Sequence, residues 1–255
     1  MKGLWRGFLT LASLLLVWQL VVTLGDLPPY ILPGPWAVML ALWHHGESLL
    51  HHAGVTALEI VLGILLGTLL GCGSALALSY SRRARRWLLP VLIASQAIPV
   101  FAIAPLLVLW LGYGMGSKIA MSMLILYFPV TANFYDGLRH TQRGWLDLAR
   151  VMLPEPRRWA VLWHIAIPAA LPALASGLRI AAAVAPIGAV LGEWVGSSAG
   201  LGYLMLHANS RMQVDLMFAA LFVLAALAVG LYFLVDTGLK RLLPWHPTIP
   251  ETEID

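Results

Sequence analysis

The sequence predicts an all-α integral membrane protein with about six transmembrane helices. The first observation behind this prediction is composition: 60% of the 255 residues are hydrophobic and 11% are charged. The mean hydropathy of +0.83 is far above that of a soluble domain. The second observation is that the apolar residues gather in runs of roughly 20, the length that an α-helix needs to cross a bilayer. These runs are apolar on every side, which excludes the alternating strands of a membrane barrel.

The first apolar run needs separate treatment, because Lys2 and Arg6 precede it as they would precede a secretory signal. It is as long as a full span, however, and no small-residue cleavage site follows it. We therefore interpret it as the first membrane helix. The expected spans are residues 7–24, 55–80, 87–111, 119–135, 167–190 and 216–235.

The distribution of positive charge predicts the orientation. With the N-terminus inside, the inner stretches hold almost all lysines and arginines, whereas the outer stretches hold only Lys118 and Arg211. The positive-inside rule therefore predicts that both termini face the cytoplasm. The basic residues form short patches rather than one continuous face, so nucleic acid is not an expected partner despite the net charge of +4.

The segments between the spans also carry a pattern. Residues 26–53 and 196–215, both outside, are amphipathic enough to lie at the membrane interface. The inner loop 138–166 has helical character and keeps Trp145, Leu148 and Met152 among charged residues, so it is expected to dock onto a partner. Residues 1–244 are expected to form one transmembrane domain, and residues 245–255 a disordered cytoplasmic tail.

The most informative stretch is residues 146–177. It resembles the coupling segment of binding-protein-dependent ABC transporter permeases, in which an acidic-Ala-Ala segment and a glycine precede Ile-x-Leu-Pro. The glycine of that pattern is missing here: counting back from Pro168 places Glu155 at its position, whereas counting forward from Asp147 places Leu153 there. The turn is therefore expected to be remodelled or lengthened. The residues that the resemblance assigns to the ATPase contact are Asp147, Ala149, Arg150, Arg157, Arg158, Trp159, Ile165 and Pro168.

Further motifs, in matching order, resemble the importer branch for nitrate, sulfonates, taurine and pyrimidine precursors. The resemblance covers most of the chain and implies a type I ABC importer permease fold. The motifs are Ile31-Leu32-Pro33-Gly34-Pro35; Gln96-Ala97-Ile98-Pro99 with Ala104-Pro105-Leu106 and Trp110-Leu111-Gly112-Tyr113-Gly114; and Gly192-Glu193-Trp194 with Gly200-Leu201-Gly202-Tyr203.

The resemblance also implies the assembly. A homodimer in the bacterial inner membrane would enclose the pathway between two copies and work with an ATP-binding cassette ATPase dimer and a periplasmic or lipid-anchored solute-binding protein. This chain has no Gly-x-x-x-x-Gly-Lys-Ser/Thr loop, so ATP and Mg²⁺ are expected on the partner ATPase and no cofactor on this chain. A thiamine pyrimidine precursor or an aliphatic sulfonate or nitrate-like anion is the expected solute.

Polar side chains inside the spans are the candidates for the translocation pathway, since burying them in lipid is costly. Gln96 with Pro99 and Pro105 predicts a broken third span that faces protein or water. Glu193 beside Trp194 is either a pathway residue or a carboxylate that caps a turn. The interpretation of the others also stays open between pathway and interface. The candidates are Gln96, Pro99, Asn133, Glu193 and Trp194 for the pathway, with Glu59 and Arg179 as further intramembrane polar residues.

Two remaining patterns predict structure rather than chemistry. Gly63, Gly67 and Gly71, at four-residue spacing, together with Gly73, predict close helix packing in the second span. The histidine pairs 44–45 and 51–52 have a spacing that would suit zinc, but only Glu47 lies near them, so no metal site is expected.

Two other classes of membrane protein are alternatives to the importer. A secondary transporter driven by an ion gradient would favour an inverted repeat, and the sequence has no evident internal repeat. A membrane-embedded enzyme would need paired carboxylates, a histidine cluster or a Ser/Lys pair facing each other, and the polar residues here are too scattered to predict one.

Overall fold

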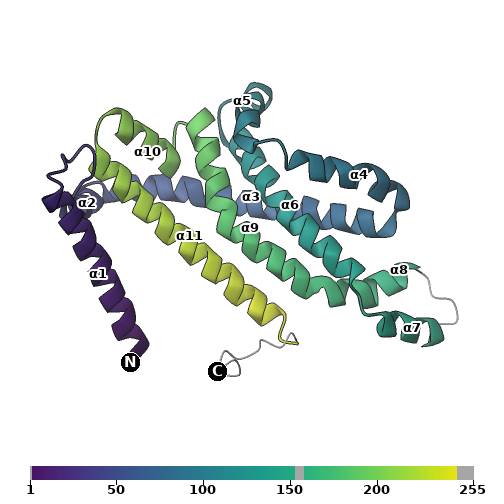
Figure 1. Ribbon diagram of the computed structural model, residues 1–255. Coiled ribbons are helices and arrows are strands. Elements are labelled where there is room, and N and C mark those ends of the chain that lie inside the picture. Colours follow the sequence, from purple (N-terminus) through teal and green to yellow (C-terminus); the bar gives the residue numbers. More distant parts are fainter. Residues whose placement is uncertain (1, 153–157, 246–255) are drawn as a thin grey trace.

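The computed structural model describes residues 2–152 and 158–245, and within these ranges all regular structure is helical (Figure 1). The predicted all-α membrane fold is confirmed, because five helices are long and apolar enough to span a bilayer and a bent pair makes up to six. The elements are α1 (Lys2–Leu24), α2 (Pro35–His44), α3 (Gly46–Tyr80), α4 (Arg82–Ser95), α5 (Val100–Leu111), α6 (Met115–Arg139), α7 (Arg143–Met152), α8 (Arg158–Val161), the π-helix η1 (Leu162–Ala166), α9 (Ile167–Gly196), α10 (Leu201–Ser210) and α11 (Val214–Leu242).

The centre of the subunit consists of α3, α6 and α9, which pack most extensively on one another. Glycines on α3 allow the close approach. A Cβ added at Gly63 would lie 2.6 Å from the Cβ of Ser122 on α6, and one at Gly71 would lie 2.9 Å from Cγ1 of Val130. Gly67 faces Leu126 in the same way, whereas a Cβ at Gly73 would meet nothing within 4 Å. The predicted packing stripe is thus confirmed for the first three glycines and wrong for Gly73, which lies about 200° around the helix from Gly71.

The third predicted span is two helices. α4 ends at Ser95, α5 begins at Val100, and their axes differ by 104°. Pro99 is the N-cap of α5, and its missing N–H makes it unable to continue the hydrogen-bond ladder of α4. The predicted break at Gln96 and Pro99 is confirmed, whereas Pro105, expected to contribute to it, lies inside α5.

The outer segments are shorter than expected. α2 and α10 form within the predicted interfacial segments, but α3 already begins at Gly46, so residues 46–53 belong to a spanning helix rather than to a loop. α3 has 35 residues and is about 50 Å long, which exceeds the roughly 30 Å of hydrocarbon. Its first turns are polar and include His51 and His52. They therefore extend beyond the part of the helix that the hydrocarbon layer covers.

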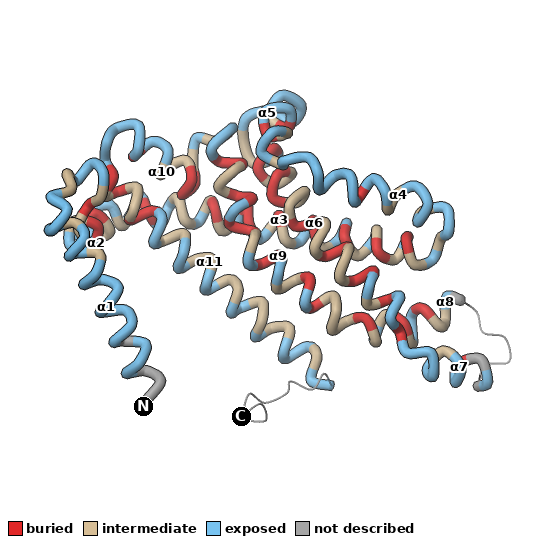
Figure 2. Tube along the Cα trace, in the orientation of Figure 1, coloured by how far each residue is buried: buried red, intermediate tan, exposed pale blue. Residues whose placement is uncertain are grey.

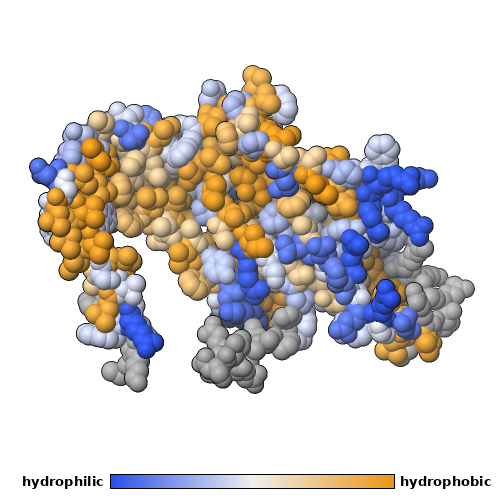
Figure 3. Space-filling model, in the orientation of Figure 1, coloured by the Kyte–Doolittle hydropathy of each residue, from blue (hydrophilic) through white to orange (hydrophobic). Residues whose placement is uncertain are grey.

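The exposed surface is largely apolar. Figure 2 shows α1 and α4 as mostly exposed, and Figure 3 shows orange side chains over much of the same face. Leu14, Leu16, Phe233 and Leu234 are each at least 60% exposed, so lipid or another protein must cover them. In Figure 1, the start of α1, the end of α11 and the α7–α8 region lie along one edge, while α2, α5 and α10 lie along the opposite one.

Candidate functional site

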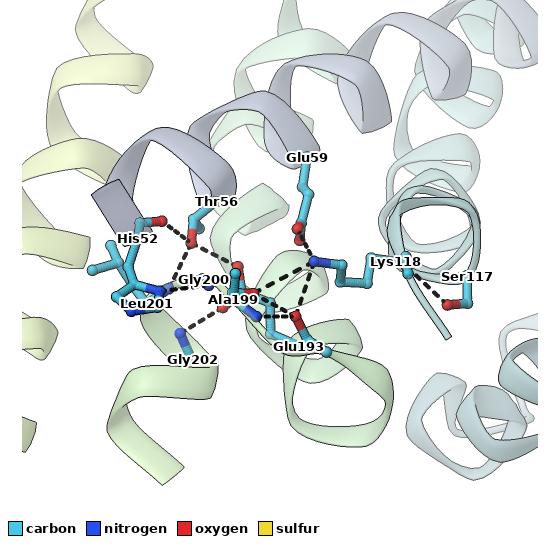
Figure 4. A network of polar contacts seen from close by, with 12 residues as sticks. His52, Thr56, Glu59, Ser117, Lys118, Glu193, Ala199, Gly200, Leu201 and Gly202 are labelled. Carbon is cyan, nitrogen blue, oxygen red and sulfur yellow. Dashed lines mark hydrogen bonds and ion pairs between the residues drawn. The ribbon is translucent and has the colours of Figure 1, made fainter. Parts of the chain in front are cut away.

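A buried polar network joins the central helices to α10 at the edge that carries α2 and α5 (Figure 4). Lys118 of α6 forms an ion pair with Glu59 of α3, and these residues are 5% and 0% exposed. The ammonium group also donates to Oγ of Ser197, at 3.0 Å, in the turn that follows α9. The sequence placed Lys118 in an outer stretch, one residue before the expected span 119–135. α6 begins earlier, at Met115, so Lys118 lies inside the helix and its side chain is buried.

The second half of the network holds the N-terminus of α10, where the first N–H groups have no partner inside the helix. Three side chains supply the missing acceptors. Nδ1 of His52 accepts from Gly200 N–H at 2.9 Å, and Oγ1 of Thr56 accepts from Leu201 N–H at 2.8 Å. Oε2 of Glu193 accepts from the N–H of residue 202 at 2.5 Å. The helix start is therefore fixed by residues of α3 and α9.

Glu193 of α9 also contacts Thr56, one of the cap residues on α3. Its Oε1 accepts a hydrogen bond of 2.6 Å from Oγ1 of Thr56, and its side chain is buried at 1% exposure. Gly200 has a φ of +122° and lies directly against the carboxylate, so a side chain there would be both strained and in collision. A carboxylate near the positive end of a helix is also favourable for the helix dipole. The arrangement matches the turn-capping interpretation that the sequence left open.

The five predicted pathway residues lie in different surroundings, and no hydrogen bond between them is present in the described part of the chain. Gln96 is exposed at the α4–α5 break and donates to Ser95, while Asn133 donates to the carbonyl of Pro129 on its own helix. Pro99 is exposed at the break, Trp194 is 48% exposed, and Glu193 is buried. Gln96 and Pro99 thus share one exposed surface, whereas Glu193 faces into the subunit.

The inner loop forms a short helical hairpin. α7 and the α8–η1 segment enclose an open apolar groove of about 580 Å³, and three of the predicted coupling residues, Ala149, Ile165 and Pro168, line it. Trp159 is 58% exposed and makes edge contacts with Tyr80 and Trp163. Asp147 is exposed on α7. Arg157 lies outside the described residues, and Arg150 and Arg158 are described as helical backbone only.

The second half of this loop contains the π-helix η1. A π turn takes up more residues than an α turn, and η1 comes directly before Ile167 and Pro168 at the start of α9. The predicted remodelling of the turn falls partly on residues 153–157, which lie outside the described residues, so it stays a prediction.

Several functional contacts were missed by sequence reasoning. Arg179 of α9, which the sequence left open between pathway and interface, donates from Nε to Oδ1 of Asp236 on α11 at 2.7 Å. Glu59 carried a signal, as a carboxylate inside an apolar run, whereas Lys118 lies one residue before the expected span 119–135 and was not recognised as its partner. Among residues 2–152 and 158–245, no three His, Cys, Asp or Glu side chains converge on a metal position.

The fold and these sites define a class of protein: a multi-pass helical membrane subunit with a capped helix at one edge and a short helical hairpin at the other. The chain belongs to the binding-protein-dependent transport system inner membrane component family, which matches residues 60–245. It is therefore a transport subunit of the ABC importer type and not an enzyme; in this family a partner subunit hydrolyses ATP.

The relatives cover almost the whole chain. A probable ABC transporter permease protein of Haemophilus influenzae is 61% identical over 93% of this chain and 96% of its own length. The formylaminopyrimidine transport permease protein ThiX of Halalkalibacterium halodurans is 35% identical over 91% and 92%. Other relatives are named for riboflavin, aliphatic sulfonates and taurine. The inward-facing MetNI methionine ABC transporter has a chain with a TM-score of 0.62 and 17% identity, over 82% of this chain and 98% of that one.

Proposed function

We propose that two copies of this chain form the translocation pathway of an importer for a small polar solute, and that α7 transmits movement from an ATPase dimer. The observation that carries this proposal is the exposed hairpin of α7, α8 and η1, which joins the two most extensively packed helices, α6 and α9. Trp145, Leu148 and Val151 on α7 are 49%, 58% and 85% exposed. An apolar helix face of this kind at the end of a helix pair fits a groove on a partner.

The pathway is proposed to follow the α4–α5 break. Residues 94–99 are exposed on the subunit and include non-helical backbone. Such backbone is tolerated at membrane depth only when protein or a wet cavity covers it. A second copy facing Gln96 and Pro99 across a water-filled pathway meets this requirement. Trp194 and Asn133 are proposed to act in the same pathway, whereas a role for Glu193 there requires its bonds to α10 and Thr56 to open.

The proposed topology follows the charges. The end of α11, which carries Lys240 and Arg241, lies along the same edge as α7 and the start of α1. Because cytoplasmic loops are richer in lysine and arginine, we place this edge in the cytoplasm of a bacterial inner membrane. α2 and α10, at the opposite edge, are then available to a periplasmic or lipid-anchored solute-binding protein.

The solute is proposed to be a thiamine pyrimidine precursor, with an aliphatic sulfonate or nitrate-like anion as the second candidate. The 35% identity to a formylaminopyrimidine permease supports the first. The relatives named for sulfonates and taurine support the second.

Uptake measured in proteoliposomes is expected to depend on ATP and not on an ion gradient. The chain is reconstituted with its ATPase and solute-binding protein, and each labelled candidate solute is supplied outside with ATP inside. We expect uptake to stop with a hydrolysis-deficient ATPase and to continue when an ionophore collapses the proton gradient. The reverse result would assign the chain to the secondary transporters. Saturable uptake of the sulfonate with none of the pyrimidine would overturn the preferred solute.

A further inference from the structure

A pocket of about 530 Å³ opens between α9 and the last two turns of α11. It is separate from the α4–α5 break, from the α10 cap and from the α7 groove, and none of the functions proposed above uses it. Ser176 and Arg179 form its wall on α9. Leu239 and Lys240 form its wall on α11, together with Leu243 directly after that helix. Figure 3 shows blue, hydrophilic side chains gathered below the orange apolar surface in this region.

The pocket holds an organised group of charges. Nε of Arg179 donates to Oδ1 of Asp236 at 2.7 Å, and Nζ of Lys240 pairs with Oδ2 of the same carboxylate at 2.7 Å. Two cations therefore share one anion, which leaves a net positive charge. Arg241 follows Lys240 in the last turn of α11 but does not line the pocket.

Both cations keep donors for a ligand. A guanidinium has five N–H groups, and the Nη groups of Arg179 make no hydrogen bond within the part of the chain that the structure describes. The side chains of Arg179 and Lys240 are 30% and 57% exposed, and Asp236 fixes their positions. Because guanidinium groups bind phosphate in a bidentate manner, a phosphate oxygen pair is the ligand that suits this site.

The surroundings favour a phosphate carried on a lipid. Leu239, Leu243 and Pro172 give the pocket apolar walls next to the cations. Phe233 and Leu234 on the preceding turns of α11 are 60% and 71% exposed, so acyl chains are expected to cover them. A basic pocket between membrane helices at the cytoplasmic side is a typical site for anionic headgroups.

We propose that this pocket binds the phosphate headgroup of an anionic phospholipid of the inner leaflet, with Arg179 and Lys240 as its ligands. The lipid then joins the inner ends of α9 and α11. Binding is expected to hold these two helices together where few other polar contacts link them in the described part of the chain.

The test measures lipid retention, so it does not depend on transport. The full chain, in complex with its ATPase, is purified in neutral detergent. Native mass spectrometry and unfolding temperature are recorded with phosphatidylglycerol, with phosphatidylcholine and with inorganic phosphate. We expect retention and stabilisation with phosphatidylglycerol alone. Lys240→Gln is expected to weaken phosphatidylglycerol binding about fivefold.

A second variant, Arg179→Gln with Asp236→Asn, removes the arginine without leaving a carboxylate unpaired, and it should weaken binding about tenfold. Arg82→Gln with Arg83→Gln, which changes two exposed cations elsewhere, is the control and should bind as the wild type does. Equal binding by all four proteins would overturn the site. Stabilisation by inorganic phosphate at similar concentrations would overturn the assignment to a lipid.

Discussion

Replacing Lys118 with methionine is expected to destabilise the subunit by about 3–5 kcal/mol, because Glu59 then remains as a buried charge without its partner. The loss should also free the turn at Ser197, to which the ammonium group donates. We expect a lower midpoint of thermal unfolding for the purified complex and less protein in the membrane. The start of α10 should become more accessible to hydrogen exchange, since this turn leads directly into it.

Two further variants separate the ion pair from a general effect of removing charge. Glu47→Gln, which changes an exposed carboxylate in the first turn of the same helix, should leave stability within about 0.5 kcal/mol of the wild type. Combining Lys118→Met with Glu59→Gln should recover part of the loss, because no buried charge then remains from the pair. Wild-type stability of Lys118→Met alone would show that the pair contributes nothing.

Replacing Gly63 with leucine is expected to cost about 1–3 kcal/mol by overpacking, or to separate α3 from α6. The Cβ of the new side chain alone would lie 2.6 Å from the Cβ of Ser122. Both atoms are bonded directly to the backbone, so rotation of a side chain cannot relieve the contact. Unfolding midpoint and cross-linking between cysteines introduced on α3 and α6 would measure the two effects.

The same helix provides a matched control. Gly73→Leu has the same gain in helix propensity and side-chain volume, but nothing lies within 4 Å of its Cβ in the subunit. It should remain within about 0.5 kcal/mol of the wild type. Equal losses at both positions would mean that the glycines serve backbone flexibility rather than contact with α6.

Local patterns in the sequence were sufficient to predict the membrane class, the packing of Gly63, Gly67 and Gly71, and the helix break at Pro99. Each depends on one helix: a run of apolar residues, a four-residue spacing, or a proline that removes a donor. Gly73 was misplaced because spacing alone does not show which face of a helix meets a neighbour. The early start of α3 was missed because its first turns are polar.

The contacts between residues far apart in the chain could not be predicted from the sequence. Thr56 and Glu193 are 137 residues apart, and Arg179 and Asp236 are 57 apart. Each pair forms only after its two helices have packed in a particular rotation, which no local pattern specifies. For the same reason the sequence left open whether Glu193 caps a turn or lines a pathway, although it identified the residue.

The measurement that tests the central claim most directly is ATP turnover by the partner ATPase in lipid vesicles. The native subunit is compared with a variant in which Trp145, Leu148 and Val151, the exposed apolar residues of α7, are alanine. A second variant, in which Leu221 and Val229, exposed on α11, are alanine, serves as the control. Assembly is checked by size-exclusion chromatography for each.

We predict that turnover stimulated by the solute-loaded binding protein falls about tenfold or more in the α7 variant, because exposed apolar anchors carry most of the energy of such a contact. The α11 control should retain stimulation. Full stimulation in an assembled α7 variant would contradict the account, since α7 would then not be the element through which the ATPase moves α6 and α9.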